Sequence, residues 1–399
     1  MFSLDDLIQK KQYKYALLHL GFRPFFLAAS IFSCFAMFIW FLLLNNQFSG
    51  LFNIAPQNWH AHEMIYGFAL AVIAGFLLTA TKNWTSIQTL HQTALLILVS
   101  LWLSARLMPF MDVSFNMHLM AVLDFLFLAY LIYAIASPVI KVKQWQHLSL
   151  ISCLLFMFVG NLFFYAGVLG VLKNGVHWSN YTGLYAVLGV LFIMGRRVIP
   201  FFIEKGVDQK ITINNRRWLD ISVAVLFILF AILDVFMQMN LILVLLASML
   251  FVLHVIRLFD WYHKSLFQKP LLWVLYVAYC FMAAGFALSA LSYIFQFSPS
   301  LALHAFAVGG VGIMTLGMMA RVALGHTGRN VFDPPTILKW LFLLVFVAAL
   351  VRVFFPLINN DWYPFWVMAS QWLWLIAFLL FAWHYTPMLI KARVDGKYG

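Results

Sequence analysis

The sequence predicts an all-α polytopic membrane protein with about twelve transmembrane helices and with both chain ends in the cytoplasm. The first observation is composition: 64% of the 399 residues are hydrophobic and 10% are charged, whereas about 25% are charged in ordinary soluble domains. The second is that apolar runs repeatedly reach the ~20 residues that a membrane-spanning helix needs. The third is an uneven distribution of Lys and Arg between alternate loops. These features exclude a soluble enzyme, a disordered chain, a secreted disulfide scaffold and an outer-membrane barrel.

The first half of the chain supplies six expected spans: 22–45, 61–81, 93–110, 115–136, 149–171 and 180–203. A polar segment, 1–20, precedes the first span and does not resemble a cleavable signal peptide, so that span would act as an uncleaved membrane signal. Asn45-Asn46, Ser137-Pro138 and Lys173-Asn174-Gly175 are turn signals between these spans.

The second half supplies six more: 217–237, 240–262, 270–296, 301–324, 335–357 and 363–388. The polar, basic loop 203–216 separates them from the first half, and Ser298-Pro299-Ser300 and Asp333-Pro334-Pro335 mark later turns. No loop is long enough for a further domain. We therefore expect one integral membrane domain, 1–399, made of a cytoplasmic segment 1–20, twelve spans within 22–388 and a cytoplasmic tail 389–399.

The net charge of +12 would suggest a nucleic-acid partner in a soluble protein. Here the basic residues fall in alternate loops, as they do in membrane proteins whose cytoplasmic loops are positive. With the N-terminus inside, all of the 25 Lys and Arg residues lie in inner segments except Arg106, Lys173 and Arg352. This asymmetry supports the span count and the N-in, C-in orientation, and no nucleic acid is expected as a partner.

The stretch Trp59-His60-Ala61-His62-Glu63-Met64 opens the second span at its outer end. Imidazole nitrogens suit copper, iron and zinc. Residues i and i+2 of a helix do not share a face, so His60 and His62 can bind one metal only if His60 precedes the helix in a non-helical segment. Otherwise one histidine is a ligand and the other supports it.

Glu63 shares a helical stripe with Gly67, Ala71, Gly75 and Thr79. One interpretation is a small-residue packing face with a buried acid at its mouth. The other is a proton donor beside a metal or haem. Because an acid inside a membrane span is unfavourable, it is by default a candidate functional residue.

A second stretch runs from His304 through Gly309, Gly310 and Gly312. The glycines would let either a flat ligand or a neighbouring helix approach closely, so His304 is either a metal ligand or a hydrogen-bonded packing residue. His326 ends the same span. At ~1.5 Å per residue it lies about 33 Å from His304, so the two cannot bind one metal. His326 is a candidate ligand of a second, inner site or a helix C-terminal cap.

Arg106 and Arg352 both sit at outer span ends. Buried arginine pairs with carboxylates in a two-pronged geometry, so haem propionates are candidate partners for both. Asp124, inside the fourth span, is a competing partner for arginine that would need no cofactor.

Taken with these stretches, the chain resembles the NnrS family of bacterial haem- and copper-containing membrane proteins. The resemblance covers nearly the whole chain, and its most specific blocks are His60-Ala61-His62-Glu63-Met64 and Gly325-His326-Thr327-Gly328-Arg329. Further matching blocks are Gly21-Phe22-Arg23-Pro24-Phe25-Phe26, Gly75-Phe76-Leu77-Leu78-Thr79-Ala80, Asn83-Trp84-Thr85, Gly195-Arg196-Arg197-Val198-Ile199-Pro200, His304-Ala305 and Arg393-Val394-Asp395-Gly396. Two positions depart from the family pattern: Ser86 stands where glycine is expected, and Tyr276 where many relatives would carry histidine. A lost histidine would affect a copper site more than a haem site.

The resemblance implies haem b, with copper as a second metal, in a bacterial cytoplasmic membrane, and a role with nitric oxide in resistance to nitrosative stress. The leading hypothesis is an oxidoreductase that reduces or scavenges nitric oxide, with quinol as the electron donor. In it Glu63 delivers protons, His62 and His304 are the first metal ligands and His60 the third, and His326, Arg106 and Arg352 contact cofactor. Two alternatives stay open: a non-catalytic haem or copper protein that senses or binds nitric oxide, and a transporter with structural histidines.

Overall fold

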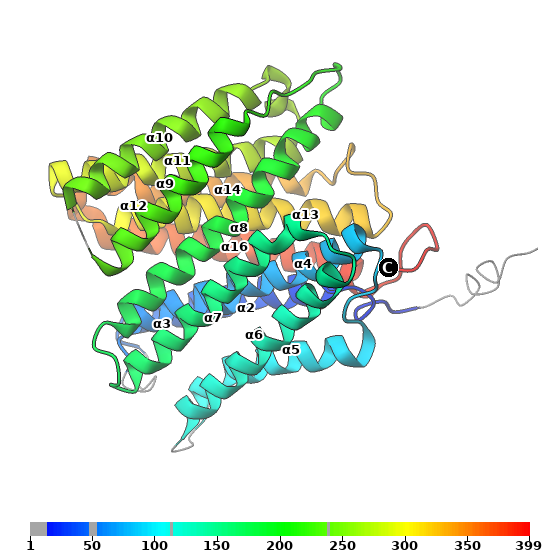
Figure 1. Ribbon diagram of the computed structural model, residues 1–399, viewed down its shortest axis with the longest axis horizontal. Coiled ribbons are helices and arrows are strands. Elements are labelled where there is room, and N and C mark those ends of the chain that lie inside the picture. The colour runs from blue at the N-terminus through cyan, green and yellow to red at the C-terminus, as the bar shows by residue number, and fades with distance from the viewer. Residues whose placement is uncertain (1–13, 48–53, 112–114, 238–239) are drawn as a thin grey trace, which may run out of the picture. The chain divides into compact units, whose positions relative to one another are not determined.

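A computed structural model describes residues 14–47, 54–111, 115–237 and 240–399 (Figure 1). Within these ranges the chain is helical and forms no β-strand, and twelve helical stretches are long and apolar enough to cross a membrane. Their ends agree with the expected spans to within about five residues. The predicted all-α class with about twelve spans is therefore confirmed, while the N-in, C-in orientation stays a prediction.

Nine of the twelve stretches contain one long helix. They are α2 (Phe22–Leu44), α5 (Gln92–Leu107), α6 (Asn116–Lys141), α7 (Leu148–Val168), α8 (Gly175–Gly206), α9 (Arg217–Phe236), α10 (Asn240–Trp261), α11 (Pro270–Phe295) and α16 (Tyr363–Ile390). A tenth stretch joins α14 (Ile337–Val353) to the short α15 (Phe355–Ile358).

The other two stretches are interrupted by a wider turn of π-helix. The second span consists of α3 (Pro56–His62), the π-helix η1 (Glu63–Ala69) and α4 (Leu70–Thr85). The tenth consists of α12 (Ser300–His304), the π-helix η5 (Ala305–Gly312) and α13 (Ile313–His326). In both, the π-helix begins at the residue after a candidate histidine, His62 or His304. Short π segments inside α-helices are rare overall, and those that occur are often found at functional sites.

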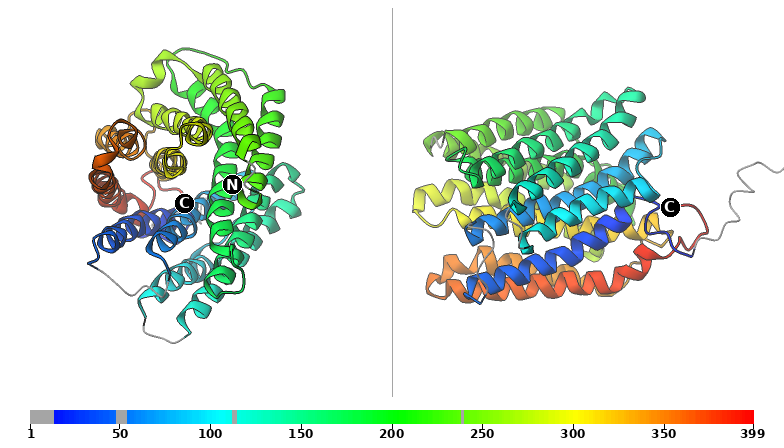
Figure 2. Two further views of the ribbon diagram at one scale, coloured as in Figure 1. Left: turned by 90° about the vertical axis from the view of Figure 1, so that its left-hand side faces the viewer. Right: turned by 90° about the horizontal axis from the view of Figure 1, so that it is seen from below.

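The chain divides into two compact units, which are described separately. Unit 1 contains residues 1–161, 319–334 and 378–399, and unit 2 contains residues 162–318 and 335–377. In unit 1, α2 packs against α4, and α5 lies beside α6 (Figure 1). In unit 2, α10 lies between α9 and α11, and η5 packs against α11 and α14 (Figure 2).

Packing of α2 on the second span explains the stripe of small residues. A Cβ added to Gly67 would lie 2.5 Å from the ring of Phe32, and one added to Gly75 would lie 2.9 Å from Phe25. Thr79 Oγ1 accepts a hydrogen bond from the backbone N–H of Phe22 at 3.1 Å. The stripe is thus a helix-packing face with Glu63 at its end.

Polar residues close the helices at one end of unit 1. The buried Arg23 guanidinium donates hydrogen bonds to the carbonyl oxygens of Met388, Leu389 and Lys391 at 2.8–3.1 Å, which caps the C-terminus of α16. A cation is favourable there because free carbonyls leave a helix C-terminus partly negative. Ser86 ends α4 with φ of 57°, a left-handed conformation that favours glycine. This explains why glycine is expected at that position.

Candidate functional site

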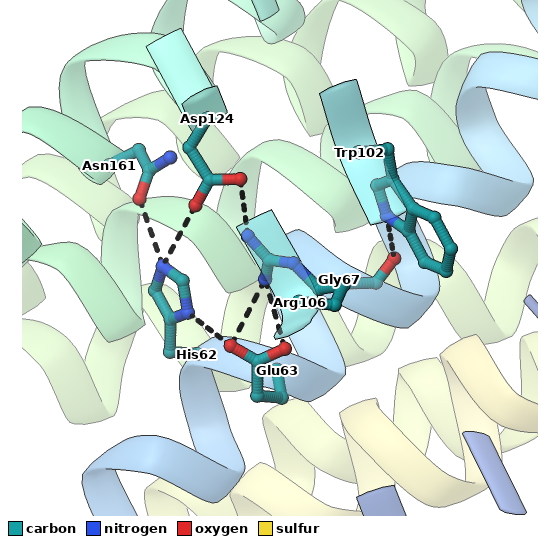
Figure 3. Close-up of polar contacts among 7 residues, drawn as sticks. All are labelled: His62, Glu63, Gly67, Trp102, Arg106, Asp124 and Asn161. Atoms are coloured by element: carbon teal, nitrogen blue, oxygen red, sulfur yellow. Dashed lines mark hydrogen bonds and ion pairs between the residues drawn. The ribbon is translucent and has the colours of Figure 1, made fainter. Parts of the chain in front are cut away.

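Five buried polar side chains of unit 1 form one network, shown in Figure 3. His62 ends α3, Glu63 begins η1, Arg106 lies in the last turn of α5, Asp124 lies in α6 and Asn161 in α7. The side chains of His62, Glu63, Arg106 and Asp124 are at most 2% exposed. Sequence analysis placed three of the five as candidates, and the structure brings those three into direct contact.

Arg106 holds the two carboxylates of the network. Its Nη1 donates to both carboxylate oxygens of Glu63 at 3.0 Å, and its Nη2 donates to Asp124. Arg106 therefore has two protein carboxylates as partners. This is the arrangement anticipated for Asp124 as a partner that needs no cofactor.

His62 uses both ring nitrogens within the network. Nδ1 lies 3.0 Å from Glu63 Oε1, and Nε2 lies 3.0 Å from Asn161 Oδ1 and 3.9 Å from Asp124 Oδ2. Both ring nitrogens of His62 thus face oxygen atoms of polar partners. The Arg106 guanidinium pairs with both carboxylates, and pairing of this kind is how buried charges are tolerated.

The π-helix helps this cluster to form. Trp102 Nε1 donates to the backbone oxygen of Gly67, inside η1, at 3.1 Å, so a side chain from α5 fixes the widened turn (Figure 3). Adjacent residues of a regular helix point in different directions. Because η1 starts at Glu63, the two neighbours His62 and Glu63 reach the same network.

His60 lies apart from this network. Its ring stacks on Trp40 of α2 with centroids 4.6 Å apart. Both His60 and His62 belong to the regular helix α3, so the condition under which the two could bind one metal, a non-helical segment at His60, is not met.

A second cluster lies in unit 2 around Arg352 of α14. Arg352 Nη2 is 3.2 Å from Ser300 Oγ, 3.3 Å from His304 Nε2 and 3.1 Å from the Tyr363 hydroxyl. His304 Nδ1 is 2.6 Å from the backbone oxygen of Ser300. With hydrogen on Nδ1, donated to this carbonyl, His304 has its Nε2 lone pair on the side of Arg352 Nη2; metal-ligating histidines use the same tautomer. Arg352 is buried, and its Nη1 has no hydrogen-bond partner.

The glycines that follow His304 are filled by protein side chains. A Cβ added to Gly309 would lie 2.3 Å from the ring of Phe281, and one added to Gly312 would lie 2.3 Å from Trp374. In this structure the glycines admit neighbouring helices, which favours the packing interpretation of this stretch.

His326 lies in unit 1, among basic side chains at the end that Arg23 caps. Its ring is 5.6 Å from that of Phe22, and Arg393 Nη1 donates to its backbone oxygen at 2.9 Å, so Arg393 caps α13 here. Nearby, burial lowers the pKa of His19, and the charges of Arg23 and Lys82 lower it further.

Sequence reasoning missed two further groups, both in unit 2. One joins His254, Arg257 and Tyr279, and the other joins Tyr185 to Asp234. His254 lies inside the eighth expected span, 240–262. The spacing of His254 and Arg257, three residues apart on one helix, is the signal that could have found the first group.

Among the described residues, no group of three or more His, Cys, Asp or Glu could hold a metal ion. Haem iron brings four porphyrin nitrogens and needs only one or two protein ligands. The unpartnered Arg352 Nη1 fits a haem carboxylate. At His304 a metal would have to displace Arg352 Nη2 from Nε2, and at His62 it would have to displace Glu63 or Asn161.

Comparison with known proteins gives one family. No curated protein matched the chain. Residues 16–393, nearly the full length, match the NnrS protein family. The matched range includes all residues of the network around Arg106 and of the cluster around Arg352. The chain therefore belongs to the NnrS family.

Proposed function

We propose that this protein is a haem-dependent oxidoreductase that reduces or scavenges nitric oxide in the cytoplasmic membrane, and so protects against nitrosative stress. The family is linked to nitric oxide. The observation that carries the proposal is the buried network of His62, Glu63, Arg106 and Asp124. Four ionisable groups inside apolar spans are energetically unfavourable and mark pathways for protons or ions.

The reaction balances with the groups at hand. Two molecules of nitric oxide, two electrons and two protons give nitrous oxide and water. Haem b, when bound, would supply an iron that binds nitric oxide. Because the gas is apolar and dissolves in lipid, a membrane site meets it directly. Electrons come from an external donor, for which quinol is our proposal.

The residues of this chain would handle protons and hold the cofactor. Glu63, whose Oε1 lies 3.0 Å from His62 Nδ1, would deliver the two protons that the reaction consumes, while Arg106 keeps the carboxylates of Glu63 and Asp124 in place. His304 is the proposed haem ligand that the geometry supports best, with Arg352 as the partner of a haem carboxylate. His62, His60 and Arg106 are second choices, because His62 and Arg106 belong to a buried charged network with contacts of 3.0 Å and His60 stacks on Trp40. His326 remains our proposal for a second, inner site, and copper for a second metal.

The test is made on the purified full-length protein. We expect a reduced haem b spectrum that shifts when nitric oxide is added, and nitrous oxide formation with an artificial electron donor. Glu63→Gln should lower turnover about 10²-fold or more, as removal of a proton donor does. Glu204→Gln is the control, because Glu204 only accepts a backbone N–H from Ile213 at 2.8 Å.

Other outcomes lead to the other hypotheses. Nitric oxide binding without nitrous oxide would point to a sensor or binding protein. A colourless protein from haem-replete cells would contradict the catalytic proposal and favour a transporter with structural histidines.

A further inference from the structure

His254 of α10 stands out among the histidines that the structure describes. Its side chain is 0% exposed, and its Nε2 has no hydrogen-bond partner. A buried polar atom without a partner is rare in native structures and calls for an explanation such as an unseen ion or ligand. The sequence alone did not single out this position.

The other side of the His254 ring is firmly held. Nδ1 lies 2.8 Å from the hydroxyl of Tyr279 on α11. Arg257 Nη1 donates to the same hydroxyl oxygen at 3.0 Å, and Arg257 Nη2 donates to Asp220 Oδ1 at 2.8 Å. Asp220 Oδ2 pairs with Arg196 at 2.6 Å. The ring orientation is thus fixed by a chain of polar contacts.

Such a chain is the arrangement that surrounds a metal-bound histidine. Ligating histidines almost always give their other ring N–H to an oxygen, which fixes the tautomer and the ring plane. With hydrogen on Nδ1, donated to the Tyr279 oxygen, the Nε2 lone pair of His254 is available to a metal. Arg257 holds the phenol oxygen in place for that bond.

The surroundings of His254 are aromatic. Its ring stacks with Phe192 at a centroid distance of 4.6 Å and with Phe286 at 5.3 Å. Phe286 in turn contacts Phe230 and Phe306 at 5.5 and 4.9 Å. The Nε2 atom therefore lies in apolar surroundings, where a polar atom without a partner is unfavourable. In the described residues His254 belongs to no group of three or more His, Cys, Asp or Glu that could hold a metal ion, so a metal here must bring further ligands of its own.

We propose that Nε2 of His254 is an axial ligand of haem iron and that Tyr279 is its positioning residue. This inference rests on the haem part of the proposed function. It adds His254 to His304 as a second candidate haem ligand in unit 2. Whether His254 binds haem can be tested without measuring nitric oxide turnover.

The test compares four versions of the full-length protein, made with ample haem: wild type, His254→Phe, Tyr279→Phe and His177→Phe. Phenylalanine at 254 keeps an aromatic ring in a phenylalanine-rich cluster, so a purely packing role would survive it. His177, at the start of α8, packs against Tyr181 with tilted rings whose centroids are 4.5 Å apart, and it serves as the matched control. Each protein is checked by size-exclusion chromatography and thermal unfolding. Haem and copper per protein and the electron paramagnetic resonance spectrum of the iron are then measured.

We expect His254→Phe to lose one haem per protein or to change the axial-ligand signature of the iron, while His177→Phe matches wild type. Tyr279→Phe should keep the haem but weaken the iron–histidine bond, seen as a lower iron–histidine stretching frequency in the resonance Raman spectrum of the reduced protein. His254→Ala, if folded, should regain the wild-type signature when imidazole is added.

Full haem content with an unchanged iron spectrum in folded His254→Phe would overturn the inference and leave the proposed function standing. Loss of copper in place of haem would overturn it as well. Loss of haem in His254→Phe from a wild type that makes no nitrous oxide would support the inference and contradict catalysis. A wild type without haem would overturn both.

Discussion

Replacing Arg106 by leucine would separate the network from its only guanidinium. Three hydrogen bonds would be lost, two to Glu63 at 3.0 Å and one to Asp124. Two carboxyl groups, each at most 2% exposed, would then face one imidazole. A buried charge without its partner is the situation in which ion-pair removal is most destabilising.

The magnitude follows from these contacts. Hydrogen bonds to charged groups are each worth about 1.5–3 kcal/mol, so three of them set an upper bound of about 9 kcal/mol. The freed carboxyl groups can take up protons, which recovers part of this. Breaking a buried pair by removing one partner costs about 3–5 kcal/mol, and we expect Arg106→Leu to lower the free energy of unfolding by this amount.

The assay is thermal unfolding of the purified protein in detergent, followed by tryptophan fluorescence. A loss of 3–5 kcal/mol corresponds to a fall in Tm of roughly 6–20 °C at the 2–4 °C per kcal/mol typical of units of 150–250 residues. Arg216→Leu is the matched control. Arg216 also holds an aspartate by two bonds of 2.8 Å, but its side chain is 41% exposed, and such surface pairs contribute about 0–1 kcal/mol.

A triple variant separates charge from packing. Arg106→Leu combined with Glu63→Gln and Asp124→Asn removes the unpaired carboxyl groups and should regain most of the lost stability. The reasoning is refuted if Arg106→Leu is no more destabilising than Arg216→Leu, or if the triple variant is as unstable as the single one.

Three further predictions concern packing, backbone and pH. Ser86→Gly should raise stability by about 1 kcal/mol in thermal unfolding, because it relieves the left-handed φ of 57°; an unchanged or lower Tm would contradict this. Gly309→Ala should lower stability by about 1–3 kcal/mol through overpacking, since its Cβ would lie 2.3 Å from Phe281. Gly195→Ala is the control and should be neutral or stabilising, because its Cβ would lie 3.5 Å from the nearest neighbour. Equal effects of the two substitutions would argue against the packing role of Gly309. Burial and nearby cations lower the pKa of His19 in the folded state. The neutral ring is therefore favoured on folding, and stability should be full above about pH 6.5 and fall as the pH drops below that value. Tm measured against pH should lose part of this acid-side fall in His19→Gln, and identical profiles would count against it.

The twelve spans could be predicted because the signal for them is local. A stretch of about 20 apolar residues must form a helix in lipid, where each backbone polar group needs an internal partner. Span ends follow turn residues, such as Pro270 at the first position of α11, and so they fall close to the expected positions. Glu63 could also be chosen as a candidate from the sequence, because an acid inside a span is unfavourable wherever the span packs.

The sequence could not show which groups contact the buried polar side chains. Arg106 had two candidate classes of partner, and only the packing of α5 and α6 around η1 placed it between Glu63 and Asp124, 43 and 18 residues away. The glycines after His304 admitted a ligand or a helix, and side chains of α11 and α16 occupy that space.

The sequence by itself determined the number, length and apolar character of the helices and the residues whose presence in a membrane demands a reason. The tertiary structure decided which of those residues meet. His254 shows the difference: its burial, its bond to Tyr279 and its unpartnered Nε2 depend on contacts between α10 and α11, and no local pattern encodes them. Helix formation in lipid is a property of each segment, whereas a site is a property of several segments packed together.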